Sequence, residues 1–306
     1  MTFPVYDLVG ETLLRALAER GLQATLPERT TLEIVLPDDR CFTQDITEWR
    51  RDADRDGPAA VAKLAAEFAD QAATVLGRYA AQPPAGGMPP AENLRLRIYT
   101  DDALGDMRDG VVTRPLAPGL LETVVVDHPD MMVVLSRADL DDADENQVFA
   151  AALSNSIGTE AHYAQTDDVQ GVPVTHIGGT HRYVGAHVHV LRRHVDQAPY
   201  GALVSFPVPE YVVMHVIGDV HLFSAMEIMQ ALSRHQFEAG EKAISPQVYW
   251  WRPGPYEQLS EEEALAGGGV PDLRPVALEF DHEEKSVTAL TTATGELVEL
   301  WMRDQA

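Results

Sequence analysis

The stretch LLETVVVDHPDMMVVLS, residues 120–136, decides the fold of the larger part of this chain. Two runs dominated by Leu, Val and Met, at 120–127 and 131–136, stand on either side of the turn sequence HPD. Short apolar runs bounded by turn residues are typical of buried strands. The stretch therefore predicts two neighbouring strands inside a sheet.

Helices are predicted on both sides of further strands, which indicates an α+β fold. Asp142 and Glu145 have the spacing of a capping box before a predicted helix at 144–158. A second helix is predicted at 224–240, where apolar side chains recur mainly on one face. Additional strands are predicted at 94–100, 111–117, 172–177, 202–208 and 210–218.

The first 81 residues predict a helix, a β-hairpin and a second helix. Leucines recur at helical spacing up to Gly21, a residue suited to a helix end. Residues 30–36 and 40–46 alternate around the turn sequence PDD, as paired strands do. An alanine-rich stretch then predicts a long helix that begins at Pro58.

A Pro/Gly-rich stretch at 82–92 contains four prolines and two glycines and predicts a linker. The prediction is therefore two mixed α/β units: a helix–hairpin–helix domain at 1–81, and a larger α+β domain with an antiparallel or mixed sheet at 93–306. The larger domain is expected to end in a β-hairpin, from alternation at 276–281, 286–292 and 296–302.

Charge is the strongest global signal. The 306 residues hold 48 acidic and 23 basic side chains, for a formal net charge of −25. Such a surface repels phosphates and anionic lipids, so we expect neither nucleic acid nor membrane as a partner. It suits a basic protein partner, although general solubility is the favoured explanation because the acidic residues are spread over the chain. A single cysteine, Cys41, and the lack of a signal peptide predict a cytoplasmic location.

Catalytic signatures are absent from the sequence. It contains no phosphate loop ending in Gly-Lys-Ser/Thr, no G-x-S-x-G elbow and no paired C-x-x-C. The double glycine in HIGGTH, residues 176–181, lacks the spacing of a dinucleotide-binding loop. Cys41 lies far in sequence from every histidine, which disfavours a Cys–His nucleophile pair. We therefore expect a non-enzymatic protein without a cofactor.

The stretch HRYVGAHVHVLRRH, residues 181–194, raises the alternative of a metal site. In a strand, two histidines two residues apart would point to one face, as metal-binding strands require. The spacing is similar to the first motif of the cupins, except that a histidine replaces the glutamate of that motif. A divalent transition metal would be the cofactor of an enzyme or sensor centred on residues 176–194. Its candidate ligands are His181, His187, His189 and His194, with His176 and His215 as further candidates.

The same stretch is compatible with a helix. Val184, Val188, Leu191 and Val195 share one helical face. His187 and a histidine two turns further on would then stand roughly 10 Å apart, too far to share one ion. Secondary structure thus decides between the two hypotheses, and the helix is favoured.

Three stretches resemble the bacterial YtpQ-like family, known as domain of unknown function 1444. They are residues 119–156, 201–219 and 231–254, and the segment DRCFTQDITEW at 39–49 is similar to the family's N-terminal unit. The resemblance implies an α+β fold, a cytoplasmic location and no assigned activity. It also implies a helix where this chain has YVGAHVHVL.

Two hypotheses of function follow. The first is a non-enzymatic protein-interaction module, of the immunity- or accessory-factor kind, which binds a basic partner through its acidic surface. Trp250, Trp251 and Tyr256 are its candidate anchors if they are exposed, whereas alternation into a core is the simpler interpretation. The alternative is the cupin-like metal site at residues 176–194.

Overall fold

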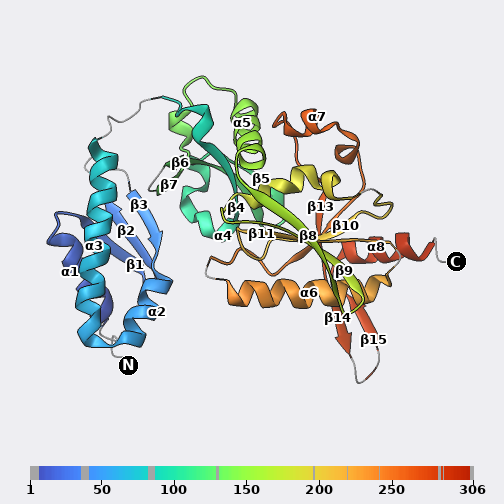
Figure 1. Cartoon of the computed structure of the whole chain (residues 1–306), viewed down its shortest axis with the longest axis horizontal. Coiled ribbons are helices and arrows are strands. Elements are labelled where there is room, and N and C mark those ends of the chain that lie inside the picture. Colours follow the sequence, from blue (N-terminus) through green and yellow to red (C-terminus); the bar gives the residue numbers. More distant parts are fainter. Residues whose placement is uncertain are drawn as a thin grey trace. The chain divides into compact units, whose positions relative to one another are not determined.

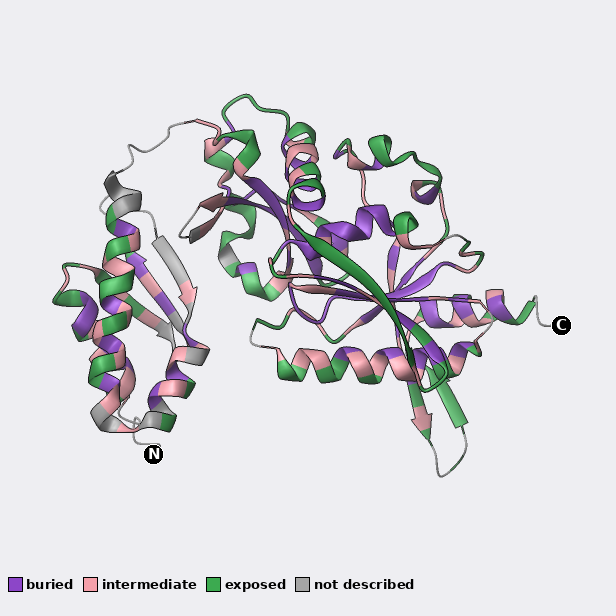
Figure 2. Cartoon of the chain, viewed as in Figure 1, coloured by how far each residue is buried: buried purple, intermediate pink, exposed green. Residues whose placement is uncertain are grey.

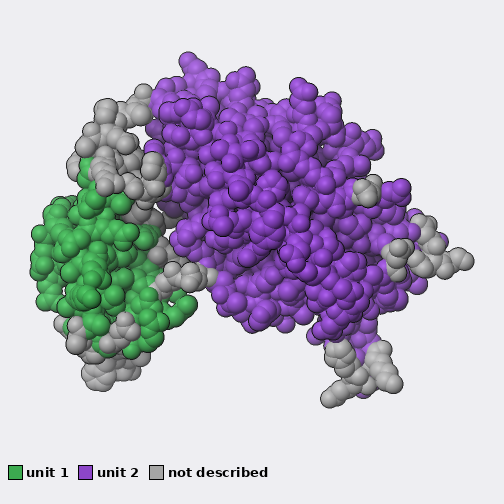
Figure 3. All heavy atoms as spheres, in the orientation of Figure 1, with its two compact units in different colours: residues 1–86 green, residues 87–306 purple. Residues whose placement is uncertain are grey.

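The computed structural model describes residues 7–35, 41–81, 87–128, 131–195, 197–218, 220–240, 242–281, 284 and 286–303. The chain divides into two compact units, residues 1–86 and 87–306, which Figure 3 colours separately. Helices and antiparallel sheets are both present, so the predicted α+β class is confirmed.

The first unit packs three helices with a three-stranded sheet. Its sheet has the order β1-β2-β3, and both strand pairs are antiparallel. The strand β1 and the short helix α2 add to the predicted helix–hairpin–helix pattern. The core is formed mainly by apolar residues of α1, β2 and α3, such as Leu13, Ile34 and Ala65. The elements are α1 (Leu8–Ala18), β1 (Gln23–Glu28), β2 (Thr31–Val35), β3 (Cys41–Asp45), α2 (Thr47–Asp56) and α3 (Pro58–Ala81).

The second unit begins with a sheet around β6, which is the first run of the opening stretch (Figure 1). The strand β6 pairs with β4 along one edge and with β5 and β7 along the other. Helix α5 packs against this sheet, with Asp144 rather than Asp142 as its N-cap. The elements are η1 (Ala91–Asn93), β4 (Leu94–Thr100), α4 (Asp101–Leu104), η2 (Gly105–Gly110), β5 (Thr113–Ala117), β6 (Leu120–His128), β7 (Met131–Val134), η3 (Arg137–Asp139) and α5 (Glu145–Gly158).

A six-stranded antiparallel sheet follows, in the order β13-β12-β10-β11-β9-β8. Helix α6 packs on one face of it, and the segment η4 packs on the other. The elements are β8 (His162–Val169), β9 (Val172–Gly179), η4 (Val184–His194), β10 (Ala202–Ser205), β11 (Tyr211–Val216), α6 (Leu222–Ala239), β12 (Val248–Trp251), η5 (Tyr256–Gln258), α7 (Glu261–Leu265) and β13 (Leu273–Val276).

Alternation along β12 places its large side chains in two different cores. Trp250 lies in the core that also holds α6, while Tyr249 and Trp251 lie in the core beneath η4. Trp250 is 1% exposed and Trp251 is 4% exposed. The simpler interpretation, alternation into a core, therefore holds for these tryptophans, and strand periodicity sends one to each buried face.

The end of the chain differs from the predicted β-hairpin. The strands β14 (Leu278–Asp281) and β15 (Ser286–Ala289) do form a hairpin, but helix α8 (Thr292–Arg303) follows them. Ala293, Leu297 and Trp301 are buried on one side of α8. Their spacing of four residues is helical, and it outweighs the weak alternation of the same segment. No helix among the described residues is long and apolar enough to span a bilayer.

Candidate functional site

The histidine-rich segment is helical. Residues Val184–His194 form η4, a 3-10 helix whose regular winding is interrupted at Val190. Val184, Val188 and Leu191 are buried against the six-stranded sheet, as the apolar periodicity predicts. The interruption changes which side chains share a face. The ring centroids of His187 and His194 are 6.2 Å apart, less than the rise of roughly 10 Å along an uninterrupted α-helix between two such positions.

His187 lies at the centre of a histidine cluster, which consists of His162, His187 and His194. The ring of His162, the first residue of β8, is 4.1 Å from that of His187 between centroids. His187 is fully buried, and neither of its ring nitrogens has a hydrogen-bond partner among the described residues. Burial, reinforced by the neighbouring histidines, lowers the pKa of His187 to about 3. Its imidazole is therefore neutral at physiological pH.

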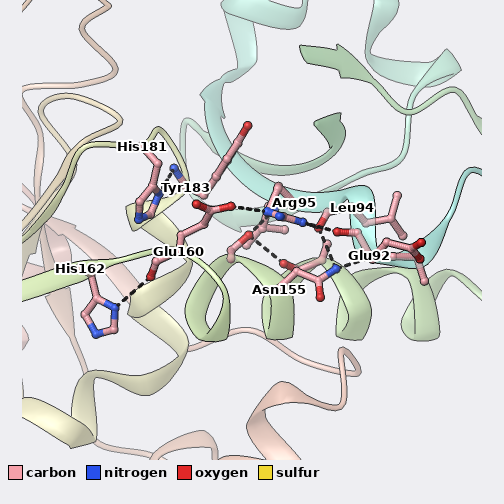
Figure 4. Close-up of polar contacts among 12 residues, drawn as sticks. Glu92, Leu94, Arg95, Asn155, Glu160, His162, His181 and Tyr183 are labelled. Atoms are coloured by element: carbon pink, nitrogen blue, oxygen red, sulfur yellow. Dashed lines mark hydrogen bonds and ion pairs between the residues drawn. The ribbon is translucent and has the colours of Figure 1, made fainter. Parts of the chain in front are cut away.

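The start of β8 is anchored beside this cluster (Figure 4). Arg95 Nε donates to Glu160 Oε1 at 2.9 Å, and Arg95 also donates to the carbonyl oxygens of Glu92 and Leu94. Asn155 of α5 donates to the Leu94 carbonyl at 3.1 Å. These bonds tie β4, α5 and the residue pair before β8 together, so the first residue of β8 is held at a defined place.

His189 points away from the cluster into a second buried network, which we call the Glu122 network. Its Nε2 hydrogen bonds with Glu122, and its Nδ1 hydrogen bonds with the Tyr256 hydroxyl. Arg114 Nε donates to the other carboxylate oxygen of Glu122 at 2.7 Å. The guanidinium of Arg114 also lies over the ring of Phe149, at 4.1 Å from its centroid. The network thus connects β5, β6, η4, η5 and α5.

The Glu122 network is better suited to holding these elements together than to catalysis. Burial alone would raise the pKa of Glu122, but His189 and Arg114 outweigh it and hold the pKa below its usual value. Burial raises the pKa of the Tyr256 phenol, so this group is not a ready nucleophile. Its hydroxyl is engaged by His189 and by the Ala264 carbonyl at 3.3 Å. Both carboxylate oxygens of Glu122 and both ring nitrogens of His189 are thus engaged within the network, and Arg114 Nη2 is its one atom buried without a hydrogen-bond partner in the described structure.

Apart from His187 and His194, the predicted metal ligands are dispersed. His181 accepts a hydrogen bond from the Tyr183 amide, His176 contacts the Gln236 side chain, and His215 bonds to the Pro173 carbonyl. Within the described ranges, no three His, Cys, Asp or Glu side chains are arranged to hold a metal ion.

We expect elemental analysis of the untagged protein to find substoichiometric zinc, iron and manganese. The reason is that the nitrogens of the histidine cluster do not converge on one point, whereas a zinc site needs ligands near 2 Å from one ion. A stoichiometric metal that the double variant His162→Ala/His187→Ala loses would contradict this.

Strand β8 is the most unusual surface element. Among the described strands it pairs only with β9, so it forms one edge of the six-stranded sheet. Seven of its eight residues, from His162 to Asp168, are exposed, and Figure 2 shows the strand green along its length. Edge strands of this length expose unpaired backbone groups that natural proteins usually shield.

A cavity of about 420 Å³ lies beside β8. Tyr163, Gln165 and Asp167 line it from one face of β8, and His176 and Tyr211 line it from the neighbouring strands. The side-chain oxygen of Gln236, which also lines the cavity, is buried without a hydrogen-bond partner in the described structure. The cavity therefore offers acceptors, including a carboxylate, next to a free sheet edge.

Comparison with known protein families, with curated proteins and with solved structures gives no match for this chain. The resemblance to the YtpQ-like family stays a prediction.

The sequence did not predict β8, because its residues HYAQTDDV are polar on both faces and show no alternation. The dipeptide Gln170-Gly171 is compatible with a tight hairpin turn before the predicted strand at 172–177. Such a turn would have indicated a preceding strand. His162 was missed for the same reason.

Proposed function

We propose that this protein is a non-enzymatic protein-interaction module of the immunity- or accessory-factor kind, and that β8 is its docking element. The observation that carries the proposal is the exposed outer edge of β8, with which no strand in the described part of the chain pairs. An extended segment of a partner adds to such an edge as a further strand, through main-chain hydrogen bonds. We place this activity in the cytoplasm, in agreement with the single cysteine of the chain.

The register of the β8–β9 hairpin identifies the backbone groups available to a partner. The hairpin turns through Gln170 and Gly171, both with positive φ, so Val169 and Val172 form the hydrogen-bonded pair next to the turn. Hydrogen-bonded and open pairs alternate from there. The N–H and C=O groups that face away from β9 are therefore those of His162, Ala164, Thr166 and Asp168.

Charge favours a basic partner. Asp167 and Asp168 are exposed on β8, and the chain carries a net charge of −25. Two copies of β8 would bring their acidic pairs together, which disfavours self-association through this edge. A lysine or arginine side chain on the added strand would find the carboxylate of Asp167 in the cavity beside β8. These features support an extended, basic segment as the ligand.

Photocross-linking tests the proposal. We expect a benzoylphenylalanine placed at the exposed position Ala164 to capture one defined protein in a lysate of the source organism, through an extended basic segment. The same group at Thr288, an exposed position of β15, serves as the control and should not capture that protein. Equal capture at the two positions, or none at Ala164, would refute docking at β8.

Two substitutions at Thr166 separate backbone pairing from side-chain effects. Thr166→Pro removes an outward-facing N–H and should abolish the cross-link at Ala164. Thr166→Ala removes the hydroxyl that contacts Thr175 but keeps the N–H, so the cross-link should persist. Asp167→Lys should weaken capture without altering the fold. A cross-link that survives Thr166→Pro would show that the partner does not add a strand.

A further inference from the structure

A second cavity in the second unit is distinct from the β8 surface. It measures about 670 Å³ and lies between the β5–β6 turn and two later segments, 254–257 and 270–273. Its walls are mainly apolar, with residues 115–121 on one side and 270–273 on the other. A volume and lining of this kind are typical of small-molecule sites.

A buried carboxylate stands in the wall of this cavity. Glu257 is 5% exposed, and neither of its oxygens has a hydrogen-bond partner of normal geometry in the described structure. Burial is the main influence on Glu257 and raises the pKa of its carboxyl group, although the nearby amides of Glu257 and Gly254 lower it in part. A buried carboxyl without a partner is costly, so its presence at a cavity calls for a compensating ligand group.

The charge around Glu257 selects the class of ligand. Among the lining residues are three carboxylates, of Asp101, Glu257 and Asp272, and one guanidinium, of Arg108. Arg108 is already paired with Asp101 at 2.9 Å, and Asp272 is paired with Arg252 and Arg274. Of the three lining carboxylates, only that of Glu257 has no ion pair in the described part of the chain. A ligand with a positively charged hydrogen-bond donor would supply the missing partner.

We propose that this cavity binds a small organic cation, with an ammonium or guanidinium group paired to Glu257 and an apolar portion against the Pro- and Leu-rich walls. The site does not use any residue of β8. The proposal therefore goes beyond docking at the sheet edge, and either can fail while the other holds.

Three probes with a similar phenylalkyl group and different head groups test the proposal: phenethylamine, phenethyl alcohol and hydrocinnamate. In NMR titrations of the full chain, we expect phenethylamine to bind about tenfold more tightly than the alcohol, because a charge-assisted hydrogen bond exceeds a neutral one. Hydrocinnamate should bind least, because its carboxylate would face Glu257.

Glu257→Gln provides the specific variant, since it keeps the shape of the side chain and removes its charge. It should abolish the preference for the amine over the alcohol, while Glu279→Gln on the exposed face of β14 should leave that preference unchanged. Equal affinity of the wild-type protein for amine and alcohol would overturn the proposal, as would a preference that survives Glu257→Gln or the absence of binding by all three probes.

Discussion

Glu122→Gln is expected to lower the free energy of unfolding of the larger unit by about 3 kcal/mol. Glu122 is fully buried between His189 and the Arg114 guanidinium, so removal of its charge leaves a buried cation without its counter-ion. Loss of one partner of a buried pair costs more than the intact pair contributes, because the remaining charge stays desolvated. Urea unfolding followed by tryptophan fluorescence measures this, since Trp250 and Trp251 belong to the same unit.

Two further variants give this prediction its controls. Glu279→Gln removes an exposed carboxylate and should change stability by less than about 0.5 kcal/mol. The triple variant Arg114→Met/Glu122→Leu/His189→Leu replaces the charged groups by apolar ones and should recover most of the lost stability. If Glu122→Gln and Glu279→Gln unfold at the same urea concentration, the Glu122 network does not hold the fold together.

His187→Leu is expected to stabilise the protein at about pH 7.5 by roughly 1–3 kcal/mol. The imidazole of His187 is buried with two unpaired nitrogens, and leucine removes this cost while filling similar space. Urea unfolding of wild type and variant at the same pH measures the difference. A variant less stable than wild type at this pH would indicate that His187 has partners that the structure does not contain.

The stabilising effect of His187→Leu should grow as the pH falls. The folded pKa of His187 is about 3, below the ordinary value of 6.5, so between these values the unfolded chain binds a proton that the folded chain excludes. Wild-type stability therefore falls below pH 6.5, by about 1.4 kcal/mol per pH unit from this group, and is fully present above it. The gap between variant and wild type should widen by about 2 kcal/mol between pH 6.5 and about pH 5.

The pH dependence has a matched control in His235, an exposed residue of α6. His235→Leu should leave the slope of stability against pH unchanged. His194 of the histidine cluster contributes in the same direction, since burial also lowers its pKa. Identical slopes for wild type and His187→Leu would show that His187 titrates normally in the folded protein.

Local apolar pattern was sufficient for most of the fold. The runs at 120–127 and 131–136 form β6 and β7, and the alanine-rich stretch forms α3 from Pro58. Such elements are predictable because the repeat of apolar side chains is a property of neighbouring residues. The apolar pattern did not predict two elements, β8 and α8. Strand β8 is exposed on both faces, so it carries no apolar repeat. In α8 the buried residues recur every four positions, but the same segment also contains a short alternation that favoured a strand.

The sequence by itself determined the α+β class, the acidic charge and the lack of catalytic signatures. Tertiary structure alone decided which ionisable groups meet. Glu122 lies in the middle of an apolar strand, and His189, which pairs with it, stands 67 residues further along the chain. His189 and His187 are two residues apart, yet they enter different networks because η4 turns them to different sides. Contacts between residues so distant in sequence depend on how the elements pack. The pattern of neighbouring residues cannot predict this packing.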